Sequence, residues 1–248
     1  MTLSAVEAAV YDRQMRLWGV EAQQRLQRAQ VLICGMSVLG SEMSKNLVLS
    51  GINVTLQDDQ EVSSDCIESQ FLFSAGNLGQ NRAVAALPKV KELNPLVNVR
   101  AETRALEELD DSYFTEYSIV LLHAFQVSKA IRCGAFIPRS LVEEFVAFSQ
   151  RELVENGLEK DFFSTAELSA LCNTSGVKLV PVCAIMAGIA GREIVKIISQ
   201  QDEPIRNIFL FDGSTGLVAC IGTSHTHAMT RPEDTMGNDR NFVVNSIL

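Results

Sequence analysis

The segment YDRQMRLWG, from Tyr11 to Gly19, gathers chemically capable side chains ahead of the first expected strand. It contains Arg13, Arg16 and Trp18, the only tryptophan of the chain. Guanidinium groups bind phosphate or carboxylate oxygens through paired hydrogen bonds, and an indole ring supplies a large apolar surface with one donor. If the segment is helical, Arg13 and Arg16 lie on the same side of it. The segment is therefore a candidate binding element.

A second candidate site follows the first expected strand, where the chain reads GMSVLG. Gly35 and Gly40 occupy the first and last glycine positions of a nucleotide-binding turn, in which glycines let a phosphate approach the helix N-terminus. Ser37 stands at the middle glycine, and Val38 adds a branched side chain where phosphate would lie. Asp58, 23 residues beyond Gly35, is placed to bind a ribose hydroxyl. The pattern indicates a nucleotide-binding frame with a compromised phosphate cradle.

Short apolar runs alternate with segments of helical periodicity, which predicts an α/β fold with a Rossmann-like, doubly wound, mostly parallel sheet. Near the C-terminus, two further strands predict an antiparallel hairpin that finishes this sheet. The expected strands are 31–35, 53–59, 97–102, 118–124, 207–213 and 217–223, with a strand or extended lead-in at 177–182, and the expected helices include 38–50, 82–93 and 183–199.

The pattern divides the chain into a helical leader, one large domain and a polar tail. The large domain is expected to carry a short insertion made of helices only, over SLVEEFVAFSQRELVENGL and TAELSALC. The expected ranges are 1–30 for the leader, with helices at 4–10 and 20–29, 31–223 for the domain, about 138–175 for the insertion and 224–248 for the C-terminal tail.

Composition excludes several classes of partner. The net charge is -9 with no basic block, so neither nucleic acid nor an anionic membrane is an expected partner. No run of 18 apolar residues and no signal-peptide pattern occurs, which predicts a soluble intracellular protein. The six cysteines include no CxxC pair, which argues against a zinc site and a disulfide scaffold. No metal site is expected, and His225 and His227 are interpreted as solvated.

Several longer motifs occur in order: YDRQMRLWG, VLICGMSVLGSEMSKNLVLSGI, QDDQEVSSDCIESQFLF, GQNRAVAALPKVKELNPLVNV, and PVCAIMAGIAGREIVKIISQ with NIFLFDG. Together they resemble the ThiF/MoeB-like adenylation fold of the ubiquitin-like-protein activating enzymes, and most closely the small, Aos-type subunits of SUMO-activating heterodimers. The resemblance covers residues 11–122 and 180–223. It implies two paired adenylation folds, of which one binds ATP and Mg and adenylates the C-terminal carboxylate of the modifier.

This chain departs from the ATP-binding half of that family at its ligand positions. The resemblance therefore implies a non-catalytic subunit, and no cofactor is expected to bind to this chain itself. Gly35, Gly40 and Asp58 would remain as a degenerate cofactor-binding site. The partner of this chain would be the large catalytic subunit, which binds ATP and Mg, and this chain would meet SUMO only indirectly. The departures are Ser37 and Val38 for two turn glycines, Gln60 for the second acid, Cys66 for an asparagine, Ser69 for an arginine and Arg82 for a lysine.

The leader gains a role from the same resemblance. In the resembling subunits, the arginine of the D-R-Q motif reaches into the partner's ATP site, which implies this trans role for Arg13. We expect Arg16 to pair with an acid, and Leu17 and Trp18 to pack the leader onto the fold or the partner. The resemblance also implies a location in the nucleus and cytoplasm.

Other interpretations remain open. The chain could be the small subunit for a Nedd-type modifier, although its length disfavours the long insertion of those subunits. It could be a degenerate scaffold, because residues 123–139 lead almost directly from the fourth strand to the helical region and omit a strand and crossover. A self-sufficient homodimeric adenylating enzyme or an NAD-dependent oxidoreductase is disfavoured by the missing glycines. Cys172 faintly resembles a catalytic cysteine but lacks the preceding proline.

Overall fold

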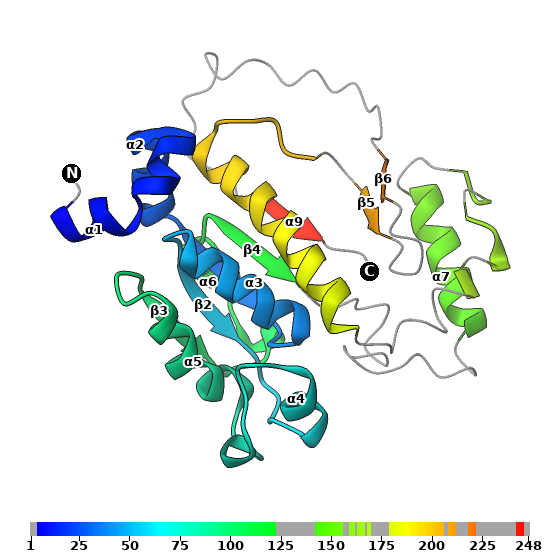
Figure 1. Cartoon of the computed structure of the whole chain (residues 1–248). Helices are drawn as coiled ribbons and strands as arrows, with labels where there is room; N and C mark the ends of the chain where they lie inside the picture. Colours follow the sequence, from blue (N-terminus) through cyan, green and yellow to red (C-terminus); the bar gives the residue numbers. More distant parts are fainter. Residues whose placement is uncertain are drawn as a thin grey trace. The chain divides into compact units, whose positions relative to one another are not determined.

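The computed structural model describes residues 4–122, 142–155, 159–161, 163–166, 168–169, 179–205, 208–211, 218–221 and 242–245 (Figure 1). The described residues up to 122 and from 180 onward belong to one compact unit, and those between 142 and 179 to a second. Within these ranges, no helix has the length and apolar character needed to cross a membrane.

A parallel sheet forms the centre of the first unit. Its strands are β1 (Gln30–Cys34), β2 (Asn53–Gln57), β3 (Val99–Glu102), β4 (Ile119–Leu122) and β7 (Phe242–Asn245). They lie in the order β3-β2-β1-β4-β7, and each neighbouring pair is parallel. This arrangement confirms the predicted α/β fold with a mostly parallel sheet.

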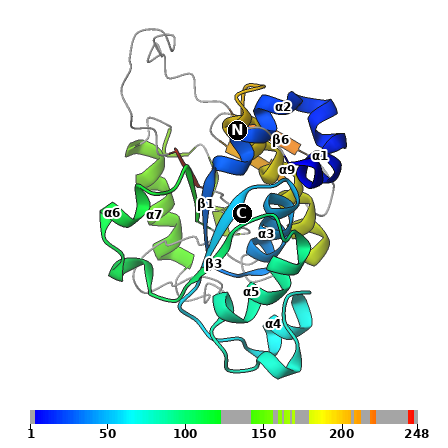
Figure 2. The same cartoon turned by 90° about the vertical axis from the view of Figure 1, so that its left-hand side faces the viewer.

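Helices lie on both faces of this sheet. Figure 2 shows α3 (Val38–Leu49), α5 (Arg82–Leu93) and α9 (Val180–Ser199) on one side of β1 and the short α6 (Asp111–Phe114) on the other. Two shorter elements, α4 (Ser64–Ser69) and η1 (Ala75–Asn77), precede α5, and η2 (Leu106–Glu108) precedes α6. The predicted double winding is therefore present, with the larger helices on one face.

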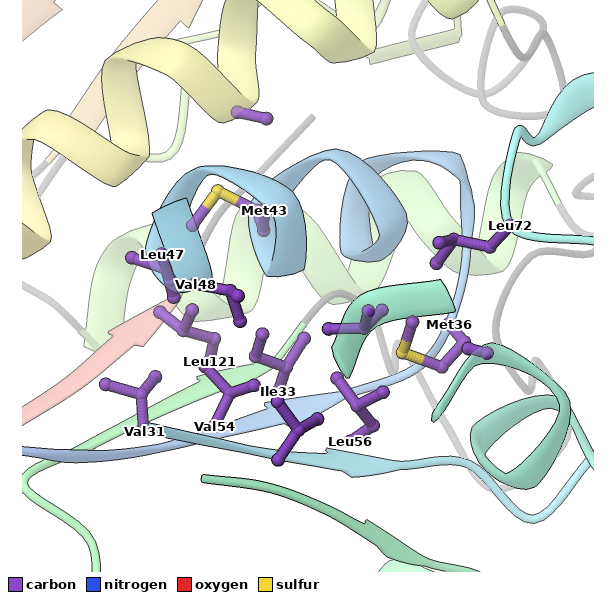
Figure 3. Packing of buried hydrophobic residues seen from close by; sticks show 14 of the residues in the cluster. Val31, Ile33, Met36, Met43, Leu47, Val48, Val54, Leu56, Leu72 and Leu121 are labelled. Carbon is purple, nitrogen blue, oxygen red and sulfur yellow. The ribbon is translucent and has the colours of Figure 1, made fainter. Parts of the chain in front are cut away.

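The alternation of side chains along β1 builds both cores. Val31 and Ile33 belong to the large cluster under α3, α5 and α9, which Figure 3 shows from close by. Leu32 and Cys34 point the other way and join a smaller cluster with Tyr117. A strand buried on both faces has to be apolar throughout, which explains the VLIC run. This packing fixes the carboxyl end of β1, where the glycine turn begins.

The leader consists of two helices, α1 (Ala5–Val10) and α2 (Asp12–Arg28). Ser4 caps α1 in a capping box with Glu7. Gly19, with φ of 83°, interrupts the helical backbone of α2, a conformation that residues with a Cβ rarely adopt. The prediction of helices at 4–10 and 20–29 was correct, and the structure adds a helical segment from Asp12 to Trp18 that carries both arginines.

The C-terminal strands correct two expectations. The hairpin of β5 (Ile208–Phe211) and β6 (Val218–Ile221) is antiparallel as predicted, but it forms a separate two-stranded sheet rather than finishing the large one. The edge of the large sheet beside β4 is instead occupied by β7, four residues within the range expected to be a polar tail. Phe242, Val243 and Val244 have high strand propensity, and that local preference outweighs the polar composition of the preceding residues.

Two helical predictions also meet the structure. In the second unit, α7 (Val142–Glu155) confirms the first expected helix of the insertion, and residues 165–166 and 168–169 are helical within the second. The strand expected at 177–182 was wrong from Val180 onward, because α9 begins there. Pro181 lies in the first turn of α9, where the missing N–H costs no helical hydrogen bond.

Candidate functional site

The glycine turn after β1 is filled by the chain's own groups. Gly35, with φ of 91°, turns the chain away from β1. Ser37 is the N-cap residue of α3, and its hydroxyl accepts a hydrogen bond from the Gly40 N–H at 3.3 Å. In a phosphate-binding turn, the first N–H groups of the helix point at the ligand. Ser37 therefore takes one of the donors that a phosphate would need.

Asp58 is held by the same turn. One carboxylate oxygen accepts from the Met36 N–H at 2.7 Å, and the other accepts from the Gln60 N–H at 2.8 Å. The Arg82 guanidinium lies 3.9 Å from the first oxygen. Asp58 is only 4% exposed, and burial raises the pKa of its carboxyl, while the two N–H donors and Arg82 oppose that rise. The acid serves to tie β2 to the turn.

The ligand positions on α4 itself carry no cation. Cys66 is buried in the large core cluster. The Ser69 hydroxyl donates to the Asp65 carbonyl at 2.6 Å, and Gln70 accepts from the Ser41 hydroxyl at 2.5 Å. Arg82 also donates through Nε to the Glu61 carbonyl at 3.0 Å.

Several polar groups of the degenerate site are already bonded within the chain. Structure brings Gly35, Gly40 and Asp58 together as the sequence predicts. Within the described part of the chain, however, the Asp58 carboxylate and the Gly40 N–H bond to the protein itself. The sequence reasoning missed Asn81, whose amide donates to the Asp58 carbonyl at 2.7 Å while its oxygen caps α5. An asparagine directly before an expected helix was the available signal.

The leader is anchored by a buried tyrosine. Tyr11 is 1% exposed, and its hydroxyl accepts a hydrogen bond from the Asn94 amide at 2.8 Å. Gly51, with φ of +87°, lies against it: a Cβ on Gly51 would be 3.0 Å from Tyr11 Cζ and 2.9 Å from Gln23 Nε2. No local sequence pattern indicates this contact, because it joins residues far apart in the chain.

Three consecutive carbonyls at the C-terminal end of α3 accept the leader and its anchor. Val48 accepts from the Asn94 amide at 2.9 Å. Leu49 accepts from Gln14 at 3.0 Å, and Ser50 accepts from Gln23 at 3.1 Å. The Val48 carbonyl also accepts from the Gly51 N–H at 3.0 Å. Carbonyls at the end of a helix can lack helical partners, so the side chains of Gln14 and Gln23 satisfy acceptors that would otherwise need water. We call this set of contacts the leader seat.

The candidate leader residues have contrasting surroundings. Arg13 is exposed and makes no hydrogen bond or ion pair with any residue in the described ranges. Arg16 pairs with Asp12 at 2.9 Å, which confirms the expected acid partner. Trp18 packs against the core and donates to Gln23 at 3.0 Å, as expected, whereas Leu17 is 79% exposed and does not pack onto the fold.

Arg13 and the degenerate turn lie at opposite ends of α3. The leader seat is built on Val48 to Ser50, while Ser37 and Gly40 are at the first turn. α3 has 12 residues, which at 1.5 Å per residue makes it about 18 Å long. That separation exceeds the reach of an arginine side chain, so Arg13 does not serve the turn of its own chain.

A charged cluster lies at the carboxyl end of β3. Glu102 accepts from Arg104 Nε at 2.9 Å and Nη2 at 2.7 Å, and the Arg104 guanidinium lies over the Tyr113 ring at 5.5 Å from its centroid. The hydrogen bonds from Arg104 lower the pKa of Glu102 from its ordinary 4.5 to about 2. The pair is therefore ionised at neutral pH. The Gln57 amide, at the end of β2, donates to the Arg104 carbonyl at 2.8 Å and links the pair to the neighbouring strand.

Replacing Arg104 with methionine should make the free energy of unfolding less dependent on pH in the acid range. A depressed carboxyl pKa stabilises the fold fully above pH 4.5, and this contribution disappears as the pH falls toward 2. The variant should be slightly less stable at pH 7, as for other partly exposed pairs, and the difference should vanish near pH 2. Urea unfolding across this range measures it. The control is Arg100→Met on the same strand, and an Arg104 difference independent of pH would contradict the assignment.

Described cysteines behave as buried thiols. Cys34 and Cys66 are buried, and Cys183 is half-buried. Burial raises the pKa of Cys34 to about 12, and burial with the nearby Glu42 raises that of Cys183, so neither is an activated nucleophile. Cys172, His225 and His227 lie outside the described residues. Among the described side chains, no group of three His, Cys, Asp or Glu could hold a metal ion.

Comparison with known proteins gives consistent matches. A profile of the ThiF family matches residues 11–125. The chain is 30% identical to SUMO-activating enzyme subunit 1 of Xenopus tropicalis, with 89% of this chain and 97% of that protein covered. It is 28% identical to the Homo sapiens protein of the same name, with 89% and 96% covered.

Solved structures share the fold. PaaA matches with a TM-score of 0.61 at 20% identity, covering 88% of this chain and 83% of that one. MccB of E. coli, crystallised with ATP, matches with a TM-score of 0.57 at 16% identity, covering 86% and 71%.

The alignment is longer than this chain. The alignment with the Xenopus tropicalis protein spans 338 positions, more than the 248 residues of this chain. That relative therefore contains segments without counterparts here.

Proposed function

Because this chain belongs to the ThiF family, we propose that it is the non-catalytic subunit of a SUMO-activating enzyme heterodimer. In this proposal, a larger catalytic subunit holds ATP and Mg and adenylates the modifier, and this chain completes that partner's site. The complex would work in the nucleus and cytoplasm. The names of the relatives support the modifier, since the matched proteins are SUMO-activating enzyme subunits.

The degenerate turn supports a non-catalytic role. Adenylation transfers negative charge onto phosphate oxygens and pyrophosphate, and positioned donors and cations must stabilise that charge. In this chain, Asp58 and Ser37 bond to their own backbone, and neither Cys66 nor Ser69 can replace a cation. We therefore expect no adenylation by the isolated chain.

The observation that best supports the proposal is that the exposed guanidinium of Arg13 makes no polar contact with the described residues. A guanidinium without partners on the described surface keeps its donors available for a ligand outside the chain. Its place at the far end of α3 is out of reach of its own turn, so in this proposal the ligand comes from a partner. An arginine supplied in trans can bind phosphate oxygens with two hydrogen bonds and stabilise transition-state charge. Arg13 would act in this way on the partner's ATP.

One observation favours a second candidate function. The internal segments present in the Xenopus tropicalis relative and absent here could include part of the partner interface. The chain would then be a degenerate scaffold, which binds a partner without supporting activation. For a Nedd-type small subunit there is no comparable support, because the two relatives reported above are named for SUMO.

Reconstitution tests the proposal. The isolated chain and the isolated large subunit of a SUMO-activating enzyme should each give little ATP–pyrophosphate exchange, and the co-purified pair should exchange readily once the modifier is added. Exchange by the isolated chain would contradict the non-catalytic assignment. A complex that assembles but does not exchange would identify the scaffold instead, and failure to co-purify would reject both.

A further inference from the structure

The backbone of Arg13 is held in place by the residues next to it in the chain. The Arg13 side chain makes no polar contact with the described residues. The position of its guanidinium is therefore constrained only by the position of the Arg13 backbone. Tyr11 and Gln14 lie on either side of it in sequence, and both are bonded to the leader seat. Beyond Trp18, the backbone break at Gly19 separates this turn from the rest of α2.

Tyr11 provides the more rigid of the two bonds. Its ring is buried against Gly51, and its hydroxyl accepts from an Asn94 amide that also donates to Val48. The Asn94 oxygen accepts from the Leu96 N–H at 3.1 Å, so the amide has all three of its polar positions occupied. An amide fixed by three bonds cannot rotate to follow a displaced tyrosine. The junction between α1 and α2 is thereby tied to α3 and α5.

We propose that Tyr11 and Gln14 are positioning residues for Arg13. Their bonds to Asn94 and to the Leu49 carbonyl hold the first turn of α2, and so the guanidinium, in place for a phosphate group of the partner's nucleotide. This inference rests on the proposed function. Arginines that stabilise a transition state have to be placed within a fraction of an ångström, and a misplacement of about 1 Å can cost about 100-fold in rate.

The hydroxyl of Tyr11 can be removed alone. Tyr11→Phe keeps the buried ring against Gly51 and deletes only the acceptor for Asn94. In the assembled complex, kcat for ATP–pyrophosphate exchange should fall about tenfold, because the turn gains freedom of a fraction of an ångström. A matched control is Tyr113→Phe, which deletes a hydroxyl bonded to Tyr117 at 2.9 Å in the smaller cluster. That variant should exchange normally.

A substitution at Gln14 distinguishes an effect on the position of Arg13 from an effect on stability. Its amide nitrogen donates to the Leu49 carbonyl, while its oxygen is buried without a partner among the described residues. Gln14→Met removes one hydrogen bond and one unsatisfied acceptor, two changes that oppose each other in stability. The melting temperature of the complex should therefore change little, whereas kcat should fall several-fold.

Combination with Arg13→Ala decides the inference. If Tyr11 and Gln14 act through the guanidinium, neither Tyr11→Phe nor Gln14→Met should slow an Arg13→Ala complex further. Equal losses in both backgrounds would overturn the inference, as would normal kcat in both single variants while Arg13→Ala is slow. Normal exchange by Arg13→Ala itself would instead reject the trans arginine of the proposed function. Heterodimer affinity, measured alongside, should be unchanged throughout.

Discussion

Arg13→Ala is expected to leave the heterodimer assembled and to slow ATP–pyrophosphate exchange about 10³-fold, the effect typical of an arginine supplied in trans. The exposed side chain makes no polar contact within the described part of its own chain, so its removal should not destabilise the fold. Exchange at saturating modifier and ATP measures the loss, and analytical ultracentrifugation verifies assembly. A variant that exchanges at the normal rate would show that the partner's site does not use Arg13.

Two further variants sharpen this result. Arg16→Ala removes an exposed arginine of the same turn that is paired with Asp12, and exchange should stay within about twofold because exposed pairs contribute little. Arg13→Lys keeps the charge but loses the planar fork that binds two phosphate oxygens. It should recover only part of the activity. If Arg16→Ala slowed exchange as much as Arg13→Ala does, the loss would come from general damage to the leader and not from the Arg13 guanidinium.

Gly51→Ala is expected to destabilise the chain by about 3 kcal/mol, the sum of a strained positive φ and an overpacked contact. The φ is +87°, and the added Cβ would meet Gln23 Nε2 at 2.9 Å and Tyr11 Cζ at 3.0 Å. Gln23 belongs to the leader seat and Tyr11 is bonded to it through Asn94, so neither side chain can withdraw without breaking those hydrogen bonds. The melting temperature should fall by about 10 °C.

A matched glycine isolates the packing contribution. Gly79 has a similar φ of +76°, but a Cβ there would meet no atom within 4 Å. Gly79→Ala should therefore cost only the conformational part, about 1 kcal/mol. Calorimetry of both variants compares them directly. Equal losses would mean that Tyr11 and Gln23 do not hold Gly51 tightly.

The sequence predicted the sheet well because its signals are local. β1 and β4 are short apolar runs, β2 and β3 contain valine and follow turn signals, and α3, α5 and most of α9 carry helical periodicity. The errors came where local signals conflict with context. Val180 to Val182 look like strand residues but open a helix, and β7 is a short apolar run at the end of a polar segment.

The candidate site was predictable by residue type but only partly by contact. Gly35, Gly40 and Asp58 were found from their spacing, because strand and turn geometry fix that spacing. The bonds that close this site depend on which neighbour each polar group reaches. Long-range contacts such as Tyr11 with Asn94 have no signal in a single sequence, since nothing local records that two distant residues meet.

The leader seat has a consequence for how sequences in this family can diverge. Its acceptors at positions 48 to 50 are peptide oxygens, which are present whatever side chains those residues carry. Substitutions at the first turn of α3, such as those at positions 37 and 38, leave these oxygens where they are. A lineage could therefore lose nucleotide chemistry at one end of a helix while the other end kept supporting the leader. What this end does require is the three donor side chains, Gln14, Gln23 and Asn94.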